Sequence, residues 1–307
     1  MNKMPFCSII IPALNEEEHL PSCLASLNAQ SYPRDRFEII VVDNGSSDDT
    51  HNIARRLSDH VFLKPDVNVG GVRNFGAEKS KGDILIFTDA DCLFHPRWLE
   101  DGALNIKSEP DTVFGGGIIS GDDSNWIQKY WTLNTTERSV QQRSLMGSCI
   151  FITKSNFLLA GRFPEDITSG EDTELSEKCM KSGLKVKISP KLSIIHMGTP
   201  KNLTDFIKRQ AWHGENYFKD IKKSTRDLVF WTILAFIISC FIFSLAAVLT
   251  KNLLWLIFPL IFPMVLSAKR IYRSRDPRNI ANIHKIFFLD LLYIVGRVKG
   301  IIKSISA

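Results

Sequence analysis

The chain has 307 residues, 44% of them hydrophobic, and a formal net charge of +5, a composition that excludes a disordered or collagen-like chain and allows one or two domains. The positive charge belongs to the C-terminal part, because residues 228–307 hold ten basic and only two acidic side chains. Since these charges lie beside long uncharged runs, we expect them to face anionic lipid head groups and expect no nucleic acid partner.

The first part of the chain alternates short β-branched runs with helical patterns, which is typical of βαβ units and a mainly parallel sheet. We expect strands over residues 7–11, 38–42 and 83–88. Asn15 is expected to cap a helix that runs to about Gln30. These elements predict one α/β domain over residues 1–227.

The six cysteines show neither a CxxC pair nor a zinc-type spacing with histidine, so we expect reduced thiols in a cytosolic domain. The apolar run at the start of the chain is too short for a signal-peptide core, which again places this domain in the cytoplasm.

Residues 228–250 carry no charge and would form a helix roughly 34 Å long, enough to cross a hydrocarbon core of about 30 Å. The run 252–268 is shorter and contains Pro263, so we expect a second span or a re-entrant segment. Basic residues flank this hairpin on both outer sides, which predicts that both ends lie in the cytoplasm. They are Lys222, Lys223 and Arg226 before it and Lys269, Arg270, Arg273, Arg275 and Arg278 after it.

The membrane region thus extends over residues 228–307, with a basic loop expected at 269–285 and a further helix at 286–303. That helix mixes apolar and charged residues, so it either lies in the membrane interface or packs on the hairpin.

Polar residues follow each of the three expected strands, and the carboxyl ends of parallel strands bind ligands in open α/β sheets. Asp89 and Asp91 flank one small residue after the third strand and could share Mg²⁺ or Mn²⁺ with a diphosphate; a solvated loop is the alternative. Asp43 could accept a hydrogen bond from a nucleotide base, or could open an Asx-turn with Gly45.

The segment from Gly70 to Gly76 is a glycine-rich entry to a helix, whose N–H groups and Arg73 could meet phosphate. Further along, His196 follows an apolar run and could contact a metal or phosphate, or could be a core histidine. Trp126, Tyr130 and Trp131 could stack on an acceptor sugar, although core packing is favoured by their spacing.

Five segments in this order resemble family 2 glycosyltransferases with the GT-A nucleotide-sugar fold. They are P-A-L-N-E-E, V-V-D-N-G-S-S-D-D-T, G-G-V-R-N-F-G, D-A-D and Gly170-Glu171-Asp172, and they fall within about residues 7–212. The resemblance implies inverting transfer from a nucleotide diphosphate sugar.

The resemblance also implies roles for individual residues. Asp91 would hold the metal, with Asp89 near the ribose and diphosphate, and Asp172 of the Glu171-Asp172 pair would be the catalytic base. The nucleoside would be held by residues at the first two strand ends, namely Pro12, Ala13, Asn15, Glu16 and Asp43. By pattern alone, Ser169 followed by Asp172 also fits a helix capping box.

The segment Arg209-Gln210-Ala211-Trp212-His213 stands where processive polysaccharide synthases carry a Q-x-x-R-W box, but departs from it, which argues against polymerisation. Arg209, Trp212 and His213 could contact the diphosphate or the acceptor; a solvated amphipathic helix is the alternative.

We therefore expect a membrane-attached, metal-dependent GT-A enzyme that moves one sugar, from a UDP-linked donor, to a lipid-linked or cell-envelope glycan at the cytoplasmic membrane face. A polyprenyl-phosphate monosaccharide synthase is the alternative within this enzyme class. A sugar-phosphate nucleotidyltransferase and a non-catalytic membrane binding protein are the alternatives from other classes.

Overall fold

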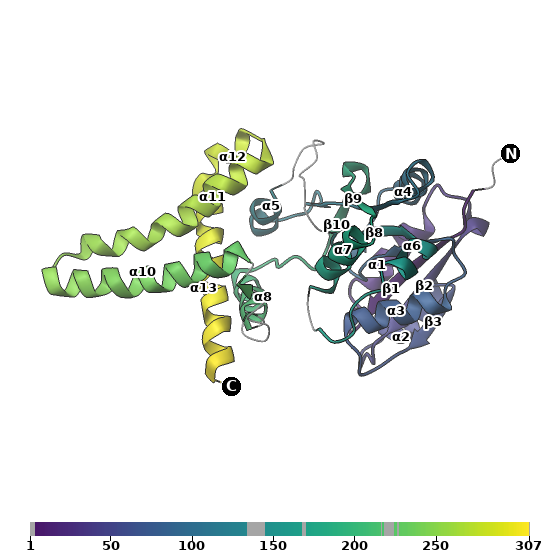
Figure 1. Ribbon diagram of the computed structural model, residues 1–307, viewed down its shortest axis with the longest axis horizontal. Helices are drawn as coiled ribbons and strands as arrows, with labels where there is room; N and C mark the ends of the chain where they lie inside the picture. Colours follow the sequence, from purple (N-terminus) through teal and green to yellow (C-terminus); the bar gives the residue numbers. More distant parts are fainter. Residues whose placement is uncertain are drawn as a thin grey trace. The chain divides into compact units, whose positions relative to one another are not determined.

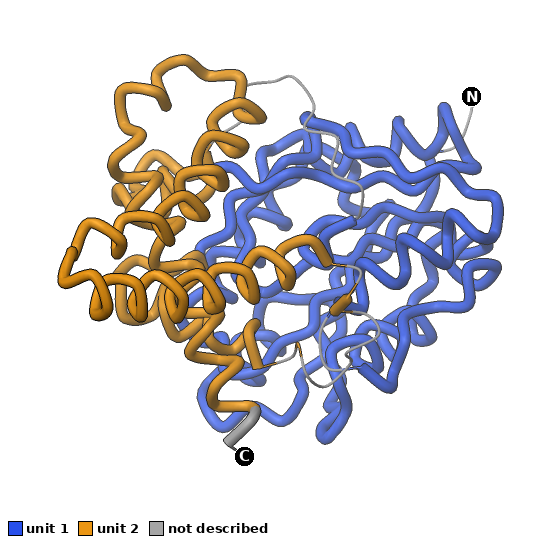
Figure 2. The backbone as a smooth tube through the Cα atoms, turned by 60° about the vertical axis from the view of Figure 1, so that its left-hand side comes forward, with its two compact units in different colours: residues 1–119, 137–198 blue, residues 120–136, 199–307 orange. Residues whose placement is uncertain are grey.

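The computed structural model describes residues 4–133, 145–167, 170–215, 217, 224–225 and 227–306. The chain divides into two compact units, residues 1–119 with 137–198 and residues 120–136 with 199–307 (Figure 2). The segment after residue 198 thus belongs with the C-terminal helices, whereas the hydropathy pattern placed the domain boundary at 227. Lys222, Lys223, Arg226 and Ser169 lie outside the described residues.

The first unit is built on a seven-stranded sheet with the strand order β3-β2-β1-β4-β8-β6-β9 (Figure 1). Every neighbouring pair is parallel except those made by β8, which runs antiparallel to β4 and β6. The predicted α/β fold with a mainly parallel sheet is therefore confirmed. The strands are β1 (Cys7–Ala13), β2 (Phe37–Asp43), β3 (His60–Leu63), β4 (Ile84–Phe87), β6 (Thr112–Gly115), β8 (Ile150–Thr153) and β9 (Lys185–Ile188).

A second, three-stranded sheet has the order β5-β10-β7 and joins three short strands that are far apart in sequence. In its antiparallel pairing, His196 of β10 lies opposite Cys92 of β5, directly after Asp91. This sheet therefore brings His196 to the end of β4. Its strands are β5 (Cys92–Leu93), β7 (Ile118–Ile119) and β10 (Ile194–His196).

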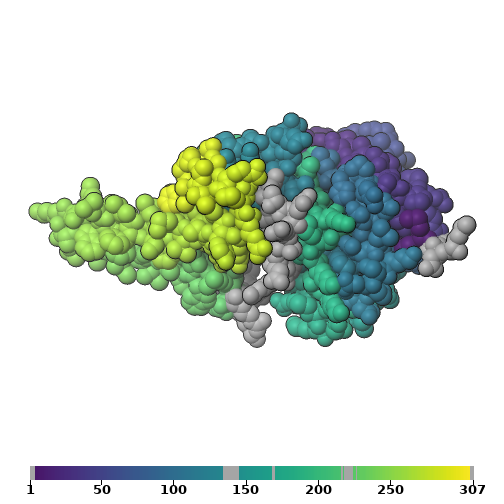
Figure 3. All heavy atoms as spheres, turned by 90° about the horizontal axis from the view of Figure 1, so that it is seen from above, coloured from purple at the N-terminus to yellow at the C-terminus, as the bar shows by residue number. Residues whose placement is uncertain are grey.

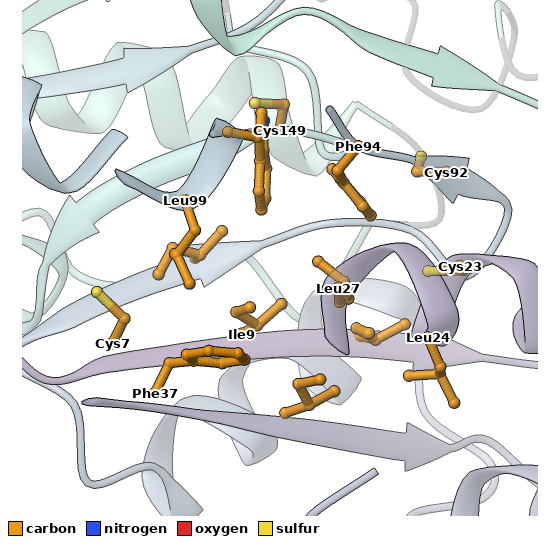
Figure 4. Packing of buried hydrophobic residues seen from close by; sticks show 14 of the residues in the cluster. Cys7, Ile9, Cys23, Leu24, Leu27, Phe37, Cys92, Phe94, Leu99 and Cys149 are labelled. Carbon is orange, nitrogen blue, oxygen red and sulfur yellow. The ribbon is translucent and has the colours of Figure 1, made fainter. Parts of the chain in front are cut away.

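Helices cover the large sheet and bury its apolar side chains. Figure 4 shows Leu24 and Leu27 of α1 directed toward the strand that carries Ile9, and all three side chains are fully buried. Burying one such side chain contributes about 1.5–3 kcal/mol. The helices of this unit are α1 (Leu20–Asn28), η1 (Arg34–Arg36), α2 (Thr50–Leu57), α3 (Val69–Lys79), α4 (Trp98–Ser108), α6 (Lys154–Leu159), α7 (Glu171–Lys181) and η2 (Pro190–Leu192).

The prediction that Asn15 caps the first helix is wrong, because α1 begins at Leu20 with Pro21 in its first turn. Asn15 instead adopts a positive φ of 55°. Its side-chain oxygen accepts the backbone N–H of Ser47 at 2.8 Å, and its own N–H donates to Ser46 at 2.9 Å. Contacts with the loop after β2, 31 and 32 residues away, therefore fix this segment.

The second unit is helical and contains the predicted apolar hairpin (Figure 1). Leu228–Thr250 and Leu253–Ser274, with mean hydropathies of 2.6 and 1.6, are long and apolar enough to cross a membrane. In Figure 3 the hairpin extends beyond the other helices of its own unit, and its outward side chains are mostly exposed and apolar. The helices are α5 (Trp126–Thr132), α8 (Leu203–Glu215), α10 (Leu228–Thr250), η3 (Leu253–Leu260), α11 (Ile261–Ser274), α12 (Arg278–Ala281) and α13 (Ile283–Ser306).

The expected basic loop at 269–285 is wrong, because most of this stretch is helical. α11 continues to Ser274 because its polar residues have partners. Arg270 forms an ion pair with the buried Asp290 of α13 at 2.5 Å and donates to the carbonyl oxygen of Tyr130 at 2.9 Å. Ser267 also donates to Asp290, at 2.7 Å.

The last helix, α13, packs on α8, α11 and α5 and so corresponds to the packed alternative predicted for 286–303. A Cβ added to Gly300 would lie 1.9 Å from the carbonyl oxygen of Ala211 on α8, so the two backbones touch. Tyr130 and Trp131 of α5 lie in the same apolar cluster, as core packing predicts, whereas Trp126 is 39% exposed.

Candidate active site

The loops that follow β1 and β2 are joined by backbone hydrogen bonds at one edge of the sheet. The N–H of Asn44 donates to Ala13 at 2.8 Å, and the N–H of Glu16 donates to the hydroxyl of Thr50 at 2.7 Å. The register pairs Ala13 directly with Asp43. The structure thus brings together the residues predicted to hold the nucleoside, which are Pro12, Ala13, Asn15, Glu16 and Asp43.

Asp43 is almost completely buried at the end of β2, and both of its carboxylate oxygens are engaged. One accepts the N–H of Ser46 at 2.9 Å, and the other lies 3.0 Å from Nδ1 of His51 on α2. The alternative of an Asx-turn is not matched in detail, because the carboxylate binds the N–H of Ser46, three residues on, while Gly45 has a φ of +88°. The predicted contact of Asp43 with a nucleotide base stays a prediction.

The D-A-D segment follows β4, and its second aspartate meets a histidine. Oδ2 of Asp91 lies 3.2 Å from Nδ1 of His196, and the carbonyl oxygen of Asp91 accepts the N–H of Met197 at 2.8 Å. The pairing of β5 with β10 therefore places the predicted metal ligands Asp91 and His196 side by side.

Negative charge accumulates at this point of the sheet. The pKa of Asp91 is raised, mainly by burial. The neighbouring His196 lowers this pKa, and the charge of Asp89 raises it. Burial also raises the pKa of Glu16, and the charge of Asp91 raises it further. A cation at this place would stabilise the ionised carboxylates.

The side chains fit a hard divalent cation. Within the described residues, Asp91, Cys92 and His196 each offer a ligand atom, and these atoms lie within 4.8 Å of one another. Burial raises the pKa of the Cys92 thiol well above its ordinary value, which leaves it a neutral, poor ligand. The carboxylate and the imidazole are suitable ligands for Mn²⁺, and carboxylates are preferred by Mg²⁺.

Arg73 connects the strand ends to the Glu171-Asp172 pair. Its guanidinium is buried against the ring of Phe163 and donates to Asp89 and to Glu171, each at 2.7 Å. Burial lowers the pKa of Arg73, but the negative charges of Asp89, Glu171 and Asp172 outweigh this effect and raise it. Arg73 therefore bridges carboxylates, and its predicted contact with phosphate stays a prediction.

The start of α3 is closely packed. The side chain of Asn68 caps the helix by accepting the N–H of Gly71 at 2.8 Å. A Cβ added to Gly70 would lie 2.2 Å from the carbonyl oxygen of Pro164. Gly70 thus permits a backbone contact within this unit, and its predicted role in nucleotide binding stays a prediction.

Asp172 lies in the first turn of α7, where the helix dipole favours a carboxylate. Its Oδ2 accepts the N–H of Gly147 at 3.0 Å, and its Oδ1 accepts the N–H of Thr173 at 2.6 Å. These donors fix the orientation of the partly exposed carboxylate. A Cβ on Gly147 would lie 2.5 Å from Nη2 of Arg73, so this glycine lets Arg73 and Asp172 share one site.

Sequence reasoning missed His51 and Gly147, whose neighbours come from distant parts of the chain. A histidine in a polar helix and a glycine before a strand have no motif of their own. Their roles follow from contacts in the folded chain: His51 contacts the carboxylate of Asp43, and Gly147 donates its N–H to Asp172.

Arg209, Trp212 and His213 lie on α8 in the second unit. Burial lowers the pKa of His213 to about 4, and the charges of Arg297 and Arg209 lower it as well. The Trp212 ring is half exposed and lies 4.8 Å from the His213 ring. Their predicted contacts with diphosphate or acceptor stay predictions.

Comparisons with known proteins agree with this geometry. The model of the family described as Glycosyl transferase family 2 matches residues 8–161. The chain is 31% identical over 223 residues to Glycosyltransferase AglE of Haloferax volcanii, which covers 69% of this chain and 73% of that protein. A second relative is an enzyme of Methanococcus voltae, named dolichyl N-acetyl-alpha-D-glucosaminyl phosphate 3-beta-D-2,3-diacetamido-2,3-dideoxy-beta-D-glucuronosyltransferase. The chain is 26% identical to it over an alignment of 335 positions, which covers 99% of both chains.

Two solved structures show the same fold. The mannosyltransferase PcManGT from Pyrobaculum calidifontis, in complex with GDP-Man and Mn²⁺, aligns with a TM-score of 0.62 at 18% identity over 97% of this chain and 88% of its own. Residues 1–349 of TarS from S. aureus, in complex with UDP, align with a TM-score of 0.52 at 17% identity over 95% and 92%. The chain therefore belongs to glycosyl transferase family 2 and is a glycosyltransferase with a GT-A fold.

Proposed function

We propose that this glycosyltransferase moves a single sugar, with inversion, from a nucleotide diphosphate sugar to a lipid-linked glycan acceptor. The observation that carries the proposal is the position of Arg73, which links Asp89 at a strand end to Glu171 beside Asp172. The carboxylates proposed for the donor side and for the base thus belong to one network.

Asp172 is the proposed base. Inversion requires removal of the proton from the acceptor hydroxyl on the face opposite the departing diphosphate, a step that typically contributes 10²–10⁴-fold. The N–H groups of Gly147 and Thr173 hold the carboxylate in place without occupying all of its lone pairs. Glu171 helps to position Arg73 and so acts beside the base.

Asp91 and His196, with Asp89 nearby, would hold Mg²⁺ or Mn²⁺. A divalent cation supplies positive charge that stabilises a leaving diphosphate. The fit rests on the 3.2 Å approach of Asp91 to His196 and on the accumulation of carboxylates around Asp91.

We favour a UDP-linked donor, because Asp43 at the end of β2 offers acceptor lone pairs to an imide N–H such as that of uracil. Nδ1 of His51 lies 3.0 Å from Oδ2 of Asp43 and so helps to fix the orientation of the carboxylate. The solved structures of similar fold hold UDP in one case and GDP-Man in the other, which makes the base the first property to measure.

A lipid-linked acceptor is supported by the apolar hairpin and by the name of the M. voltae relative, which contains a dolichyl phosphate sugar. Holding an enzyme at the surface where its acceptor lies raises the effective concentration of both. We place the catalytic part of residues 1–227 on the cytoplasmic side and residues 228–307 at the membrane, since basic residues follow the hairpin.

The test uses the full-length protein in detergent with a panel of UDP- and GDP-sugars. We expect release of nucleoside diphosphate that requires Mn²⁺ or Mg²⁺ and stops with EDTA. Transfer to a polyprenyl-linked sugar should then yield a product whose anomeric configuration, read by NMR, is opposite to that of the donor. Retention of configuration, or metal-independent release, would contradict the proposal.

A further inference from the structure

Arg297 on α13 has an unusual environment within the second unit. Its guanidinium lies over the rings of Tyr217 and Tyr293, at 5.5 and 5.1 Å, and Nη1 donates to the Tyr217 hydroxyl at 3.3 Å. Its Nε is buried and has no hydrogen-bond acceptor. Among the residues that the structure describes, no carboxylate oxygen lies within 4.0 Å of this cation.

The elements around Arg297 bring a second guanidinium, that of Arg209 on α8, to the same place. Burial and the charges of Arg297 and Arg209 lower the pKa of His213 to about 4, so this side chain is neutral at pH 7. Gly214, the next residue of α8, would place a Cβ 2.4 Å from the Arg297 carbonyl oxygen, so the two helices touch at this level.

The described acidic groups nearby are already engaged. Asp227 caps α10 by accepting the N–H of Val229 at 2.9 Å and also accepts the hydroxyl of Tyr217 at 3.3 Å. Glu215 is paired with Lys303 at 2.7 Å. A partly buried guanidinium with an unsatisfied donor, and with no ion pair to any described residue, is unfavourable unless an anion joins it.

We propose that Arg297, together with Arg209 and an N–H of the neutral His213, binds a phosphate group carried by a lipid, namely the phosphate of the polyprenyl-linked acceptor. The inference rests on the proposed function. Guanidinium groups suit phosphate because their N–H groups form a planar fork.

The neighbours of this cluster point to a lipid phosphate. Tyr217 packs in one apolar cluster with Phe230 and Ile233 of α10 and with Ile301 of α13. Arg297 therefore lies beside the first turns of a helix that is apolar enough to span a membrane. This is the level at which lipid phosphates are found, next to the hydrocarbon region.

The test measures the binding of a C55 polyprenyl monophosphate to the full-length protein in nanodiscs of phosphatidylcholine, without any donor. We expect Arg297→Gln to weaken binding at least tenfold and Arg297→Lys to weaken it less, since lysine keeps the charge and loses the fork. Lys299→Gln is the matched control, because Lys299 is exposed on the same helix and should leave the affinity at the wild-type value. Wild-type affinity of Arg297→Gln would overturn the proposal.

Three competitors identify the source of the phosphate. We expect the uncharged polyprenol not to compete, and phosphatidylglycerol and inorganic phosphate to compete at least tenfold less well than the polyprenyl phosphate. Equal competition by phosphatidylglycerol would mean a general anionic-lipid surface, and equal competition by inorganic phosphate would mean a site without lipid specificity; either result would overturn the assignment.

Two further measurements keep the inference separate from the proposed function. Hydrolysis of nucleotide sugars by the wild-type protein is measured in parallel, so a failure of the enzymatic proposal is visible without affecting the binding result. If Arg297→Gln does not fold by thermal unfolding, Arg209→Gln replaces it, because Arg209 is exposed on α8. This variant should weaken binding too, and unchanged binding would count against the site.

Discussion

The guanidinium of Arg73 donates to the carboxylate of Glu171 at 2.7 Å, although the two residues lie 98 positions apart in the chain. The same guanidinium holds Asp89 at the same distance. One buried cation thus fixes two acidic residues, one after strand β4 and one at the start of helix α7, and its loss should affect stability and activity together.

Arg73→Gln should lower the free energy of unfolding by about 3–5 kcal/mol, because it leaves the buried Glu171 and its neighbour Asp89 without their counter-ion. Sugar transfer should fall with it. Denaturant unfolding and a transfer assay measure both effects. Lys81→Gln, at an exposed position after the same helix, is the control and should change neither. A stable and fully active Arg73→Gln variant would contradict the bridging role.

Asp172→Asn should reduce transfer by about 10²–10⁴-fold, since an amide cannot accept the proton of the acceptor hydroxyl. Donor binding should remain, because the contacts of Asp172 are with Gly147 and Thr173. Transfer kinetics and calorimetry with UDP separate the two effects. Glu177→Gln on the exposed face of α7 is the control. Retained transfer to a bare lipid phosphate would favour a polyprenyl-phosphate monosaccharide synthase.

Asp91→Asn should abolish the stabilisation of the protein by Mn²⁺ with UDP, because it removes the proposed carboxylate ligand. Without metal, the variant should be at least as stable as the wild type, since one of several neighbouring negative charges is gone. Thermal unfolding with and without Mn²⁺ and UDP measures both parts. Asp111→Asn, at an exposed position, should keep the wild-type response. A metal-dependent shift in Asp91→Asn would exclude Asp91 as the ligand.

Gly300→Ala should lower the free energy of unfolding by about 1–3 kcal/mol, because the added methyl group would lie 1.9 Å from the Ala211 carbonyl oxygen. Urea unfolding of the detergent-solubilised protein measures the change. Val295→Ala on the exposed side of the same helix should cost much less. An unchanged Gly300→Ala protein would show that α8 and α13 are not in contact in solution.

His213 should make the protein less stable as the pH falls. Its pKa in the folded protein is about 4, below the ordinary value of 6.5, so the unfolded chain binds the proton more tightly. The contribution of the neutral His213 to the free energy of unfolding is fully present above pH 6.5. It is lost progressively as the pH falls to 4, and amounts to about 3 kcal/mol at most. Thermal unfolding between pH 7 and 4 should show a smaller decrease for His213→Gln. If the wild type and His213→Gln lost the same stability between pH 7 and 4, protonation of His213 would not be the cause.

The strands and their polar ends could be predicted because they depend on local patterns. Alternating β-branched runs set β1, β2 and β4, and the carboxyl ends of parallel strands place Asp43 and Asp91 at one edge of the sheet. The apolar hairpin was equally visible, because its uncharged length of 23 residues is a property of one continuous segment.

Contacts between distant segments could not be predicted. Nothing near Asn15 indicates that Ser47 takes its side chain away from the helix start. The charges of 269–285 suggested a loop because Asp290, which neutralises Arg270, comes 20 residues later. The assignment of α8 to the C-terminal unit depends on glycines in both helices, a feature that hydropathy does not detect.

The close approach of α8 and α13 also constrains how the protein is made. α8 leaves the ribosome before the hairpin of α10 and α11, and α13 is synthesised after both. The apolar side of α8, including the fully buried Phe206, therefore lacks its cover until α13 has been synthesised. Chains that stop anywhere before residue 283 should therefore leave this side of α8 exposed to water.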